Sequence, residues 1–210
     1  AIAKLNSMRA QSTTGFHMCN SILMQTALLN NEYVQQQQEF CMSELFEELG
    51  LNSDQRIFFD SNCTDKLVTD KSLVSNILYQ AVQNALIHGA KDRKICLEAN
   101  RIGQTQLCVT IWNQKGDNHE KLLALHGYAP LLAQKSATLM AAGIGGAHST
   151  FLGLSEMQSA AAAFSPPGQL TLTPDEDGVT FELRIVVDFI VPAQVSVCES
   201  LPYDLVFACC

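Results

Sequence analysis

The apolar residues between positions 70 and 89 come as adjacent pairs at four-residue intervals, which is the spacing of one helical face. This pattern predicts an amphipathic helix that begins after the capping residue Asp70 and ends at Gly89. The opposite side of the helix lacks the usual Lys and Glu. It carries uncharged or weakly basic side chains one turn apart, namely Asn76, Gln80, Asn84 and His88.

Two further helical patterns precede this segment. Residues 13–34 contain no Pro and space their apolar side chains like a helical stripe, which predicts one long helix. A polar run at 35–39 follows. Residues 40–50 then predict a short helix that Ser43 can cap and Gly50 ends.

Strand patterns alternate with turn signals in the rest of the chain. The strand-like segments are residues 56–63, 93–103, 106–114 and 168–189. Gly-Gln-Thr separates the second segment from the third, which predicts a hairpin, and the last segment is long enough for another hairpin. Residues 114–150 predict a long loop with at most short helical pieces, and loops of that length usually serve a function. Residues 151–164 return to a helical pattern.

Composition and net charge limit the number of domains and the kinds of partner that the chain can have. A chain of 210 residues with 47% hydrophobic residues can bury one sizeable core. Its net charge of -8, with 13 scattered basic residues, argues against nucleic acid or an anionic membrane surface as a partner. No apolar run approaches the roughly 20 residues of a membrane span. We therefore expect a cytoplasmic chain, cut from a longer parent that a membrane segment outside it could anchor.

The eight cysteines show no Cys-x-x-Cys spacing and mostly have apolar neighbours. This distribution favours buried free thiols in a reducing compartment over a zinc site, which would need paired ligands.

The order of these motifs resembles the ATP-binding domain of sensor histidine kinases, in the wider group of gyrase, Hsp90 and MutL. The matching features are the helix with QAVQNALIHG, a strand pair ending in VTIWNQ, a glycine-containing loop, LGLS opening a helix, and a final hairpin. The resemblance covers roughly residues 38–188. It implies an α/β fold, a two-layer sandwich in which a mixed sheet carries three helices on one face. ATP would lie between the helix that contains Asn84 and the glycine-containing loop.

The most specific motif of the resemblance is the asparagine box, and it implies that Asn84 is the metal ligand. Mg²⁺ prefers octahedral oxygen coordination and keeps several waters, so an amide oxygen can complete its shell. Gln80 lies one turn earlier, where related proteins often carry a polar or acidic residue that orients water or phosphate. His88 lies one turn later and is placed to approach the phosphates from the other side.

Both glycine boxes depart from the family pattern. In the first, Asn113 stands where an Asp accepts a hydrogen bond from the exocyclic amine of adenine, and Lys115 lies near the first expected Gly. The second box keeps Gly153 and Leu154, but Phe151 replaces a Gly. An Asn oxygen accepts a hydrogen bond without the strength that a charge adds, so we expect weaker adenine recognition.

The loop upstream of the second box supplies further glycines. Gly143 and Gly145 are expected to bring backbone amides close to the phosphates, in place of the missing Gly. The altered boxes together predict that catalysis is slow or lost.

The phosphoacceptor histidine is expected outside this chain. His17 lacks the acidic neighbour that follows the acceptor in the family, and it lies too close in sequence to the asparagine box. We therefore expect residues 1–36 to be the second helix of a dimerisation hairpin. Residues 37–190 would form the ATP-binding domain, and residues 191–210 a linker or the start of a following domain.

The leading functional hypothesis is transfer of the ATP γ-phosphate to a histidine of a sensor or hybrid histidine kinase. The implied partners are ATP or ADP with Mg²⁺, the dimerisation and phosphoacceptor helices of the same or a second chain, and a response-regulator receiver domain. The full-length protein would be a homodimer. One alternative is a non-catalytic nucleotide-sensing or docking module. A gyrase-type or Hsp90-type ATPase is less favoured because Gln80 replaces the carboxylate that such enzymes use as a general base.

Overall fold

The computed structural model describes residues 15, 19–51, 54–126 and 152–190. It contains a five-stranded sheet in the order β2-β4-β5-β7-β6, in which β2 and β4 are parallel and the other neighbours antiparallel. The strands are β2 (Ile57–Ser61), β4 (Ile95–Ile102), β5 (Gln106–Gln114), β6 (Gln169–Pro174) and β7 (Gly178–Val186). This is the mixed sheet that the sequence predicts, with both hairpins confirmed.

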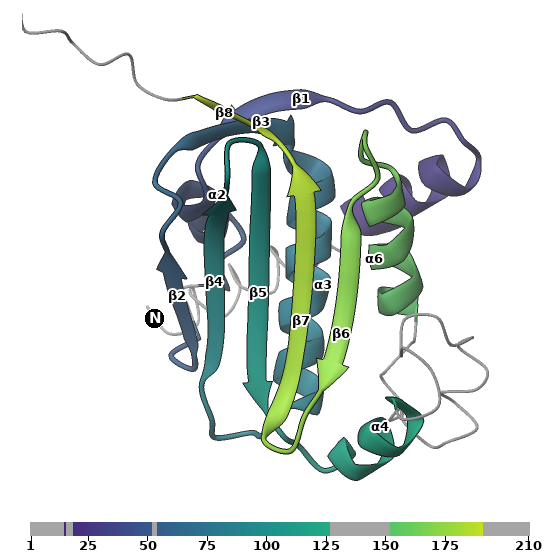
Figure 1. Ribbon diagram of the computed structural model, residues 1–210. Coiled ribbons are helices and arrows are strands. Elements are labelled where there is room, and N and C mark those ends of the chain that lie inside the picture. Colours follow the sequence, from purple (N-terminus) through teal and green to yellow (C-terminus); the bar gives the residue numbers. More distant parts are fainter. Residues whose placement is uncertain (1–14, 16–18, 52–53, 127–151, 191–210) are drawn as a thin grey trace, which may run out of the picture.

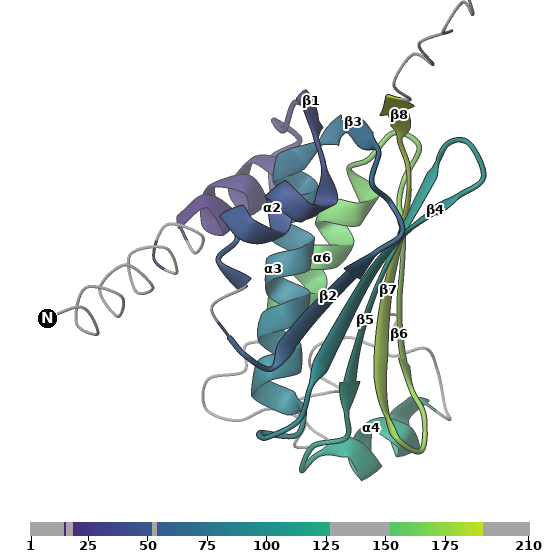
Figure 2. The same ribbon diagram turned by 90° about the vertical axis from the view of Figure 1, so that its left-hand side faces the viewer.

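Three helices cover one face of this sheet, as Figures 1 and 2 show. They are α2 (Met42–Glu48), α3 (Lys71–His88) and α6 (Leu152–Ala162). A further helix at 19–29 lies on the helical side, and α4 (His119–His126) lies at one end of the sheet. The predicted two-layer α/β sandwich is therefore confirmed.

The alternation of apolar residues along the central strands explains this layering. Leu107, Val109 and Ile111 of β5 are buried toward the helices, as are Leu183 and Ile185 of β7. Successive strand residues point to opposite faces, so this period of two gives the sheet one apolar face. The paired apolar residues of α3 complete the core against it.

A second sheet was not predicted from the sequence. It has three strands in the order β1-β3-β8, and all its pairs are antiparallel. The strands are β1 (Gln37–Phe40), β3 (Lys66–Asp70) and β8 (Asp188–Ile190). The β1 strand lies largely in the polar run at 35–39, for which we predicted no strand. Three of its four side chains are exposed, so its sequence lacks the apolar alternation by which strands are recognised.

Asp70 joins this small sheet to α3. Its buried carboxylate accepts hydrogen bonds from the Leu73 N–H at 3.0 Å and from the Gln36 N–H at 2.8 Å. The Tyr33 hydroxyl donates a third, at 2.9 Å. The predicted cap of α3 is thus confirmed, and the same side chain also fixes the segment that leads into β1. Burial, together with the hydrogen bond to this carboxylate and its charge, raises the pKa of Tyr33.

Some predicted helix boundaries are wrong. The helix expected over 13–34 ends at residue 29, and Asn31 follows with a φ of 56°. The residue that caps α2 is Cys41 rather than Ser43, and its N–H donates to the Glu44 carboxylate at 3.4 Å. The chain turns after this helix at Gly50, with a φ of 68°, as its sequence predicts.

The five cysteines within the described ranges are free. Only Cys63 and Cys108 among them are buried, and burial raises the pKa of both thiols. Cys19 is exposed, so the expectation of buried thiols is wrong for that residue. In the part of the chain that the structure describes, no helix is long and apolar enough to cross a membrane.

Replacing Asp70 by Ala should lower the free energy of unfolding by roughly 2–4 kcal/mol, because it removes a helix cap and leaves buried donors unpaired. Tyr33→Phe should cost about 1 kcal/mol in the wild type and less in the Asp70→Ala background. Urea unfolding measures both. Asp92→Ala, which removes an exposed carboxylate, is the control. A cost below about 0.5 kcal/mol for Asp70→Ala would contradict this account of the cap.

Candidate functional site

Helix α6 runs beside α3 on the same side of the sheet (Figure 1). The polar row of α3 consists of Asn76, Gln80, Asn84 and His88. Asn76 is buried, whereas Gln80, Asn84 and His88 are partly buried. The row faces neighbouring elements because the apolar residues of α3 occupy the side toward the sheet. A row of amides placed in this way can bind a polar ligand between α3 and the segments next to it.

Gly153, in the first turn of α6, brings two residues of this row together. A Cβ atom added to Gly153 would lie 3.2 Å from Gln80 Oε1, 3.7 Å from Asn84 Nδ2 and 3.9 Å from Asn84 Oδ1. The first of these separations is tighter than ordinary van der Waals contact. A glycine therefore allows α6 to approach the amide row without displacing Gln80. The structure thus places Gln80, Asn84 and Gly153 in one group, as the sequence predicts.

A hydrogen-bonded cluster lies on the Gln80 side of this group. Gln80 Nε2 donates to Glu156 Oε2 at 3.0 Å and to Ser21 Oγ at 3.3 Å. Ser21 Oγ in turn donates to the same Glu156 oxygen at 3.1 Å. Three separate segments, the helix at 19–29, α3 and α6, therefore meet at one carboxylate. Ser21 is buried, whereas Glu156 is partly buried.

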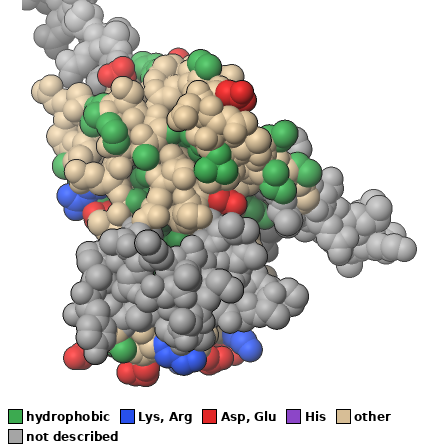
Figure 3. Space-filling model, turned by 90° about the vertical axis from the view of Figure 1, so that its right-hand side faces the viewer, with side chains coloured by type: hydrophobic (Ala, Val, Ile, Leu, Met, Phe, Trp, Pro, Cys, Tyr) green, Lys and Arg blue, Asp and Glu red, His purple; other side chains and the backbone are tan. Residues whose placement is uncertain are grey.

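Neither Ser21 nor Glu156 was identified from the sequence. Glu156 follows Gly153 by three residues, which places the two on the same side of a helix, so helical spacing could have indicated it. Ser21 lies 59 residues before Gln80, and no local pattern indicates a contact across that separation. Figure 3 shows the side of the molecule where α6 lies. On its described part, uncharged atoms predominate and the basic side chains form no continuous patch.

His88 lies at the other end of the row, beside a pocket of about 270 Å³. The lining residues are Ile87, His88, Gly89, Ala90, Lys91, Lys115, Gly116, Asp117 and Asn118. Burial lowers the pKa of His88, so the imidazole is neutral at pH 7. A neutral imidazole offers one donor and one acceptor nitrogen to a ligand.

Asn113 lies at the end of β5, against the last turn of α3. A Cβ atom on Gly89 would come within 2.8 Å of Asn113 Nδ2, so a larger residue than Gly would displace this amide. Asn113 Nδ2 donates to the Gln114 carbonyl at 3.1 Å. The amide oxygen is then the group that can accept a hydrogen bond from a ligand. Asn113 and His88 thus form a second group around Gly89.

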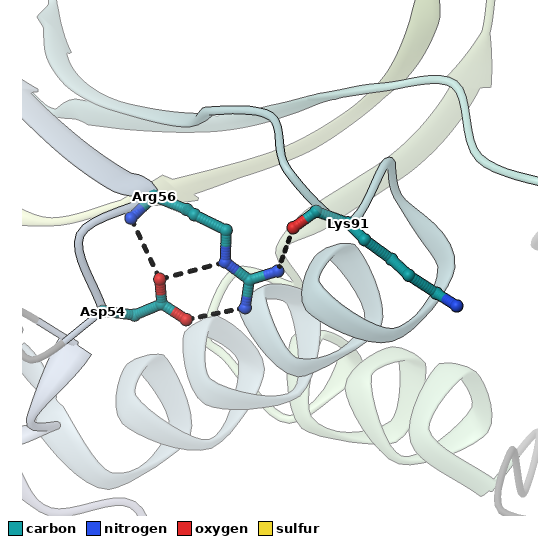
Figure 4. Close-up of polar contacts among 3 residues, drawn as sticks. All are labelled: Asp54, Arg56 and Lys91. Atoms are coloured by element: carbon teal, nitrogen blue, oxygen red, sulfur yellow. Dashed lines mark hydrogen bonds and ion pairs between the residues drawn. The ribbon is translucent and has the colours of Figure 1, made fainter.

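The loop after α3 is held by a charged pair that Figure 4 shows. The Arg56 guanidinium donates to both carboxylate oxygens of Asp54, at 3.0 and 2.7 Å, and to the Lys91 carbonyl at 2.8 Å. The hydrogen bond to Arg56 lowers the pKa of Asp54. Arg56 therefore connects the start of β2 to the wall of the His88 pocket.

Three further residues of the predicted site are Leu154, Gly143 and Gly145. Leu154 is partly buried and its side chain packs against the hydrophobic core, so only its backbone can face a ligand. Gly143 and Gly145 lie outside the described residues. His119 is buried, with Nε2 2.6 Å from the Asp175 carbonyl. It supports the turn between β6 and β7.

The fold is that of histidine kinase catalytic domains. The full-length histidine kinase ShkA, in complex with AMPPNP, matches 90% of this chain with a TM-score of 0.59 and 13% identity, and the match covers 39% of ShkA. The Acinetobacter baumannii histidine kinase AdeS matches 87% of this chain and 83% of its own, with a TM-score of 0.54 and 14% identity. The nucleotide-free catalytic domain of histidine kinase ThkA matches 72% of this chain and 95% of its own, with a TM-score of 0.50 and 20% identity. No protein-family model and no curated protein matches the sequence.

The lowered pKa of His88 gives a pH dependence whose sign can be tested. The unfolded chain binds a proton at this residue near pH 6.5, before the folded chain does, so stability should fall as the pH drops through that value. His88→Gln should lose less stability than wild type between pH 7.5 and 5.5, measured by urea unfolding. A folded-state NMR titration midpoint for His88 at or above 6.5 would contradict the assigned burial.

Proposed function

We propose that this domain binds Mg·ATP and transfers the γ-phosphate to a histidine outside the chain, as the catalytic part of a sensor or hybrid histidine kinase. The observation that supports this most directly is the close approach of α6 at Gly153 to Gln80 and Asn84, where an added Cβ would lie 3.2 Å from Gln80 and 3.7 Å from Asn84. We take this approach as support for pairing the proposed second glycine box with the proposed asparagine box, in a fold like that of histidine kinase catalytic domains. Phosphoryl transfer depends mainly on positioning and on stabilising charge, and both boxes serve those purposes.

Asn84 is the proposed ligand of Mg²⁺. Its amide oxygen has the chemistry that this ion prefers. When bound, the metal neutralises charge on the phosphates. The first turn of α6, at Gly153 and Leu154, would direct backbone N–H groups at them. Gly143 and Gly145 are proposed to add further backbone donors.

Adenine recognition is assigned to Asn113, whose amide oxygen would accept from the exocyclic amine. The hydrogen bond from Arg56 to the Lys91 carbonyl and the close packing of Gly89 against Asn113 would hold this end of the site in place. His88 would stay neutral beside the nucleotide and donate one hydrogen bond. Gln80 orients the reacting groups through its hydrogen bonds to Ser21 and Glu156.

The proposal places the acceptor histidine on other helices, in the same or a second chain. Neither His88 nor His119 suits that role, because the first is partly buried with a lowered pKa and the second is buried against Asp175. Residues 1–36 would belong to the dimerisation helices of a homodimer, residues 37–190 to the catalytic domain, and residues 191–210 to a linker. A receiver domain would take the phosphate onward in the cytoplasm.

One observation favours a non-catalytic nucleotide sensor as the second candidate. Lys115 stands near the first expected Gly, and its Nζ donates to the Glu176 carbonyl at 3.1 Å. That contact joins the first glycine box to the turn between β6 and β7. Binding of nucleotide without phosphate transfer would distinguish this candidate from the kinase.

Asn84→Ala should abolish the Mg²⁺ dependence of ATP or ADP binding and weaken affinity at least tenfold, because it removes a metal ligand. Titration calorimetry with and without Mg²⁺ measures both effects. Gln83→Ala is the matched control, since this neighbouring amide is also partly buried but lies outside the polar row. Equal binding of Mg-nucleotide by Asn84→Ala and wild type would show that the metal assignment is wrong.

Asn113→Asp should tighten adenine nucleotide binding, because a charged acceptor makes a stronger hydrogen bond than an amide. The gain is limited to on the order of 1 kcal/mol, since the carboxylate must also be desolvated. Calorimetry with ADP, and with inosine diphosphate in which a carbonyl replaces the exocyclic amine, separates this contact from phosphate binding. An unchanged or weaker affinity for ADP would place adenine elsewhere.

A further inference from the structure

Ser21, Glu156 and Gln80 have the arrangement of a nucleophile, a base and an orienting group. Ser21 Oγ donates to Glu156 Oε2 at 3.1 Å, which is within the reach that proton transfer requires. Gln80 Nε2 contacts both of these atoms, at 3.3 and 3.0 Å. It therefore holds the hydroxyl and the carboxylate together.

This cluster lies next to the proposed phosphate site. Gln80 is one helical turn from Asn84, and a Cβ added to Gly153 would lie within 4 Å of both residues. Glu156 is on α6, one turn after Gly153. Residue 80 is a glutamine and offers no carboxylate. Glu156, on the neighbouring helix α6, places a carboxylate beside the Gln80 amide.

We propose that Ser21 is a phosphoacceptor of this chain, with Glu156 as its general base and Gln80 as the positioning residue. This inference rests on the proposed nucleotide site, because the phosphate comes from ATP. It adds a second activity, autophosphorylation on serine, to the transfer to histidine.

The step balances with ATP as the phosphoryl donor. Ser21 Oγ forms a bond to the γ-phosphorus while the bond from that phosphorus to the β–γ bridging oxygen breaks, and ADP leaves with the electron pair. The hydroxyl proton passes to Glu156 Oε2, which already accepts the hydrogen bond. The products are ADP, phosphoserine and a protonated glutamate that returns its proton to solvent.

The hydroxyl of Ser21 is distinguished from its neighbours by its hydrogen-bond partner. Thr26, on the same helix, donates to the Ile22 carbonyl at 2.8 Å, and Ser75 on α3 donates to the Lys71 carbonyl at 2.6 Å. A backbone carbonyl cannot act as a base at neutral pH, whereas a carboxylate can.

The test incubates the 210-residue chain with Mg²⁺ and γ-³²P-ATP, after calorimetry has measured nucleotide binding. We expect phosphate that survives acid treatment, which phosphohistidine does not, and mass spectrometry should place it on Ser21. Ser21→Ala should lose the label, whereas Ser21→Thr should carry phosphothreonine. Thr26→Ala, the matched hydroxyl control on the same helix, should be labelled as wild type.

The variant Glu156→Gln distinguishes a role of Glu156 as general base from a purely structural role. It keeps an oxygen that can accept the Ser21 hydrogen bond but cannot take the proton. Labelling should slow by about 10²–10⁴-fold, with nucleotide affinity within about threefold of wild type. In the absence of nucleotide, the double variant Ser21→Ala, Glu156→Ala should lose less free energy of unfolding than the sum of the two single variants, because Ser21 and Glu156 share a hydrogen bond.

The outcomes distinguish this inference from the function on which it rests. Nucleotide binding without acid-stable label on Ser21, or unchanged labelling in Glu156→Gln, overturns the serine acceptor and leaves the proposed kinase intact. Failure to bind nucleotide overturns both. Acid-stable label that moves to threonine in Ser21→Thr and slows in Glu156→Gln supports the proposal.

Discussion

The buried carboxylate of Asp70 is the constraint on which the rest of the structure depends. It accepts hydrogen bonds from Leu73 in the first turn of α3, and from Gln36 and Tyr33 before β1. Successive helical residues differ by about 100° in direction, so a rotation of α3 about its axis changes which side chains face α6. By anchoring Asp70 to Gln36 and Tyr33, the cap helps to fix that rotation and with it the direction of the amide row. The cap therefore sets the geometry of a site more than two turns away.

The second requirement is that α6 approach α3 closely at a polar surface. Packing between helices normally uses apolar side chains, whereas here Gly153 lies against two amides. The absence of a side chain makes the approach possible, and the hydrogen bonds of Gln80 to Ser21 and Glu156 satisfy the polar groups that the approach covers.

The sequence predicts most of the large sheet and its helices, because their apolar periods of two and 3.6 are strong. The resemblance in the order of motifs assigns Gln80, Asn84 and Gly153 to one site, and the structure brings these three residues close together. The β1-β3-β8 sheet could not be predicted, because exposed polar strands such as β1 have no apolar alternation and depend on distant partners. Ser21 was missed for the same reason: its hydrogen bonds join residues 59 and 135 positions apart.

The small sheet has a mechanical consequence. Its middle strand, β3, pairs antiparallel with β1 on one side and with β8 on the other, and β3 ends at Asp70. Tension applied at residue 190 along the direction of β8 would load the hydrogen bonds of that pair in shear, so that several must break together rather than one after another. Part of the load would reach the first turn of α3 through β3, while the chain itself would carry the rest into β7 of the large sheet. The strand pair is thus a stiff connection between residue 190 and the helix that carries the amide row.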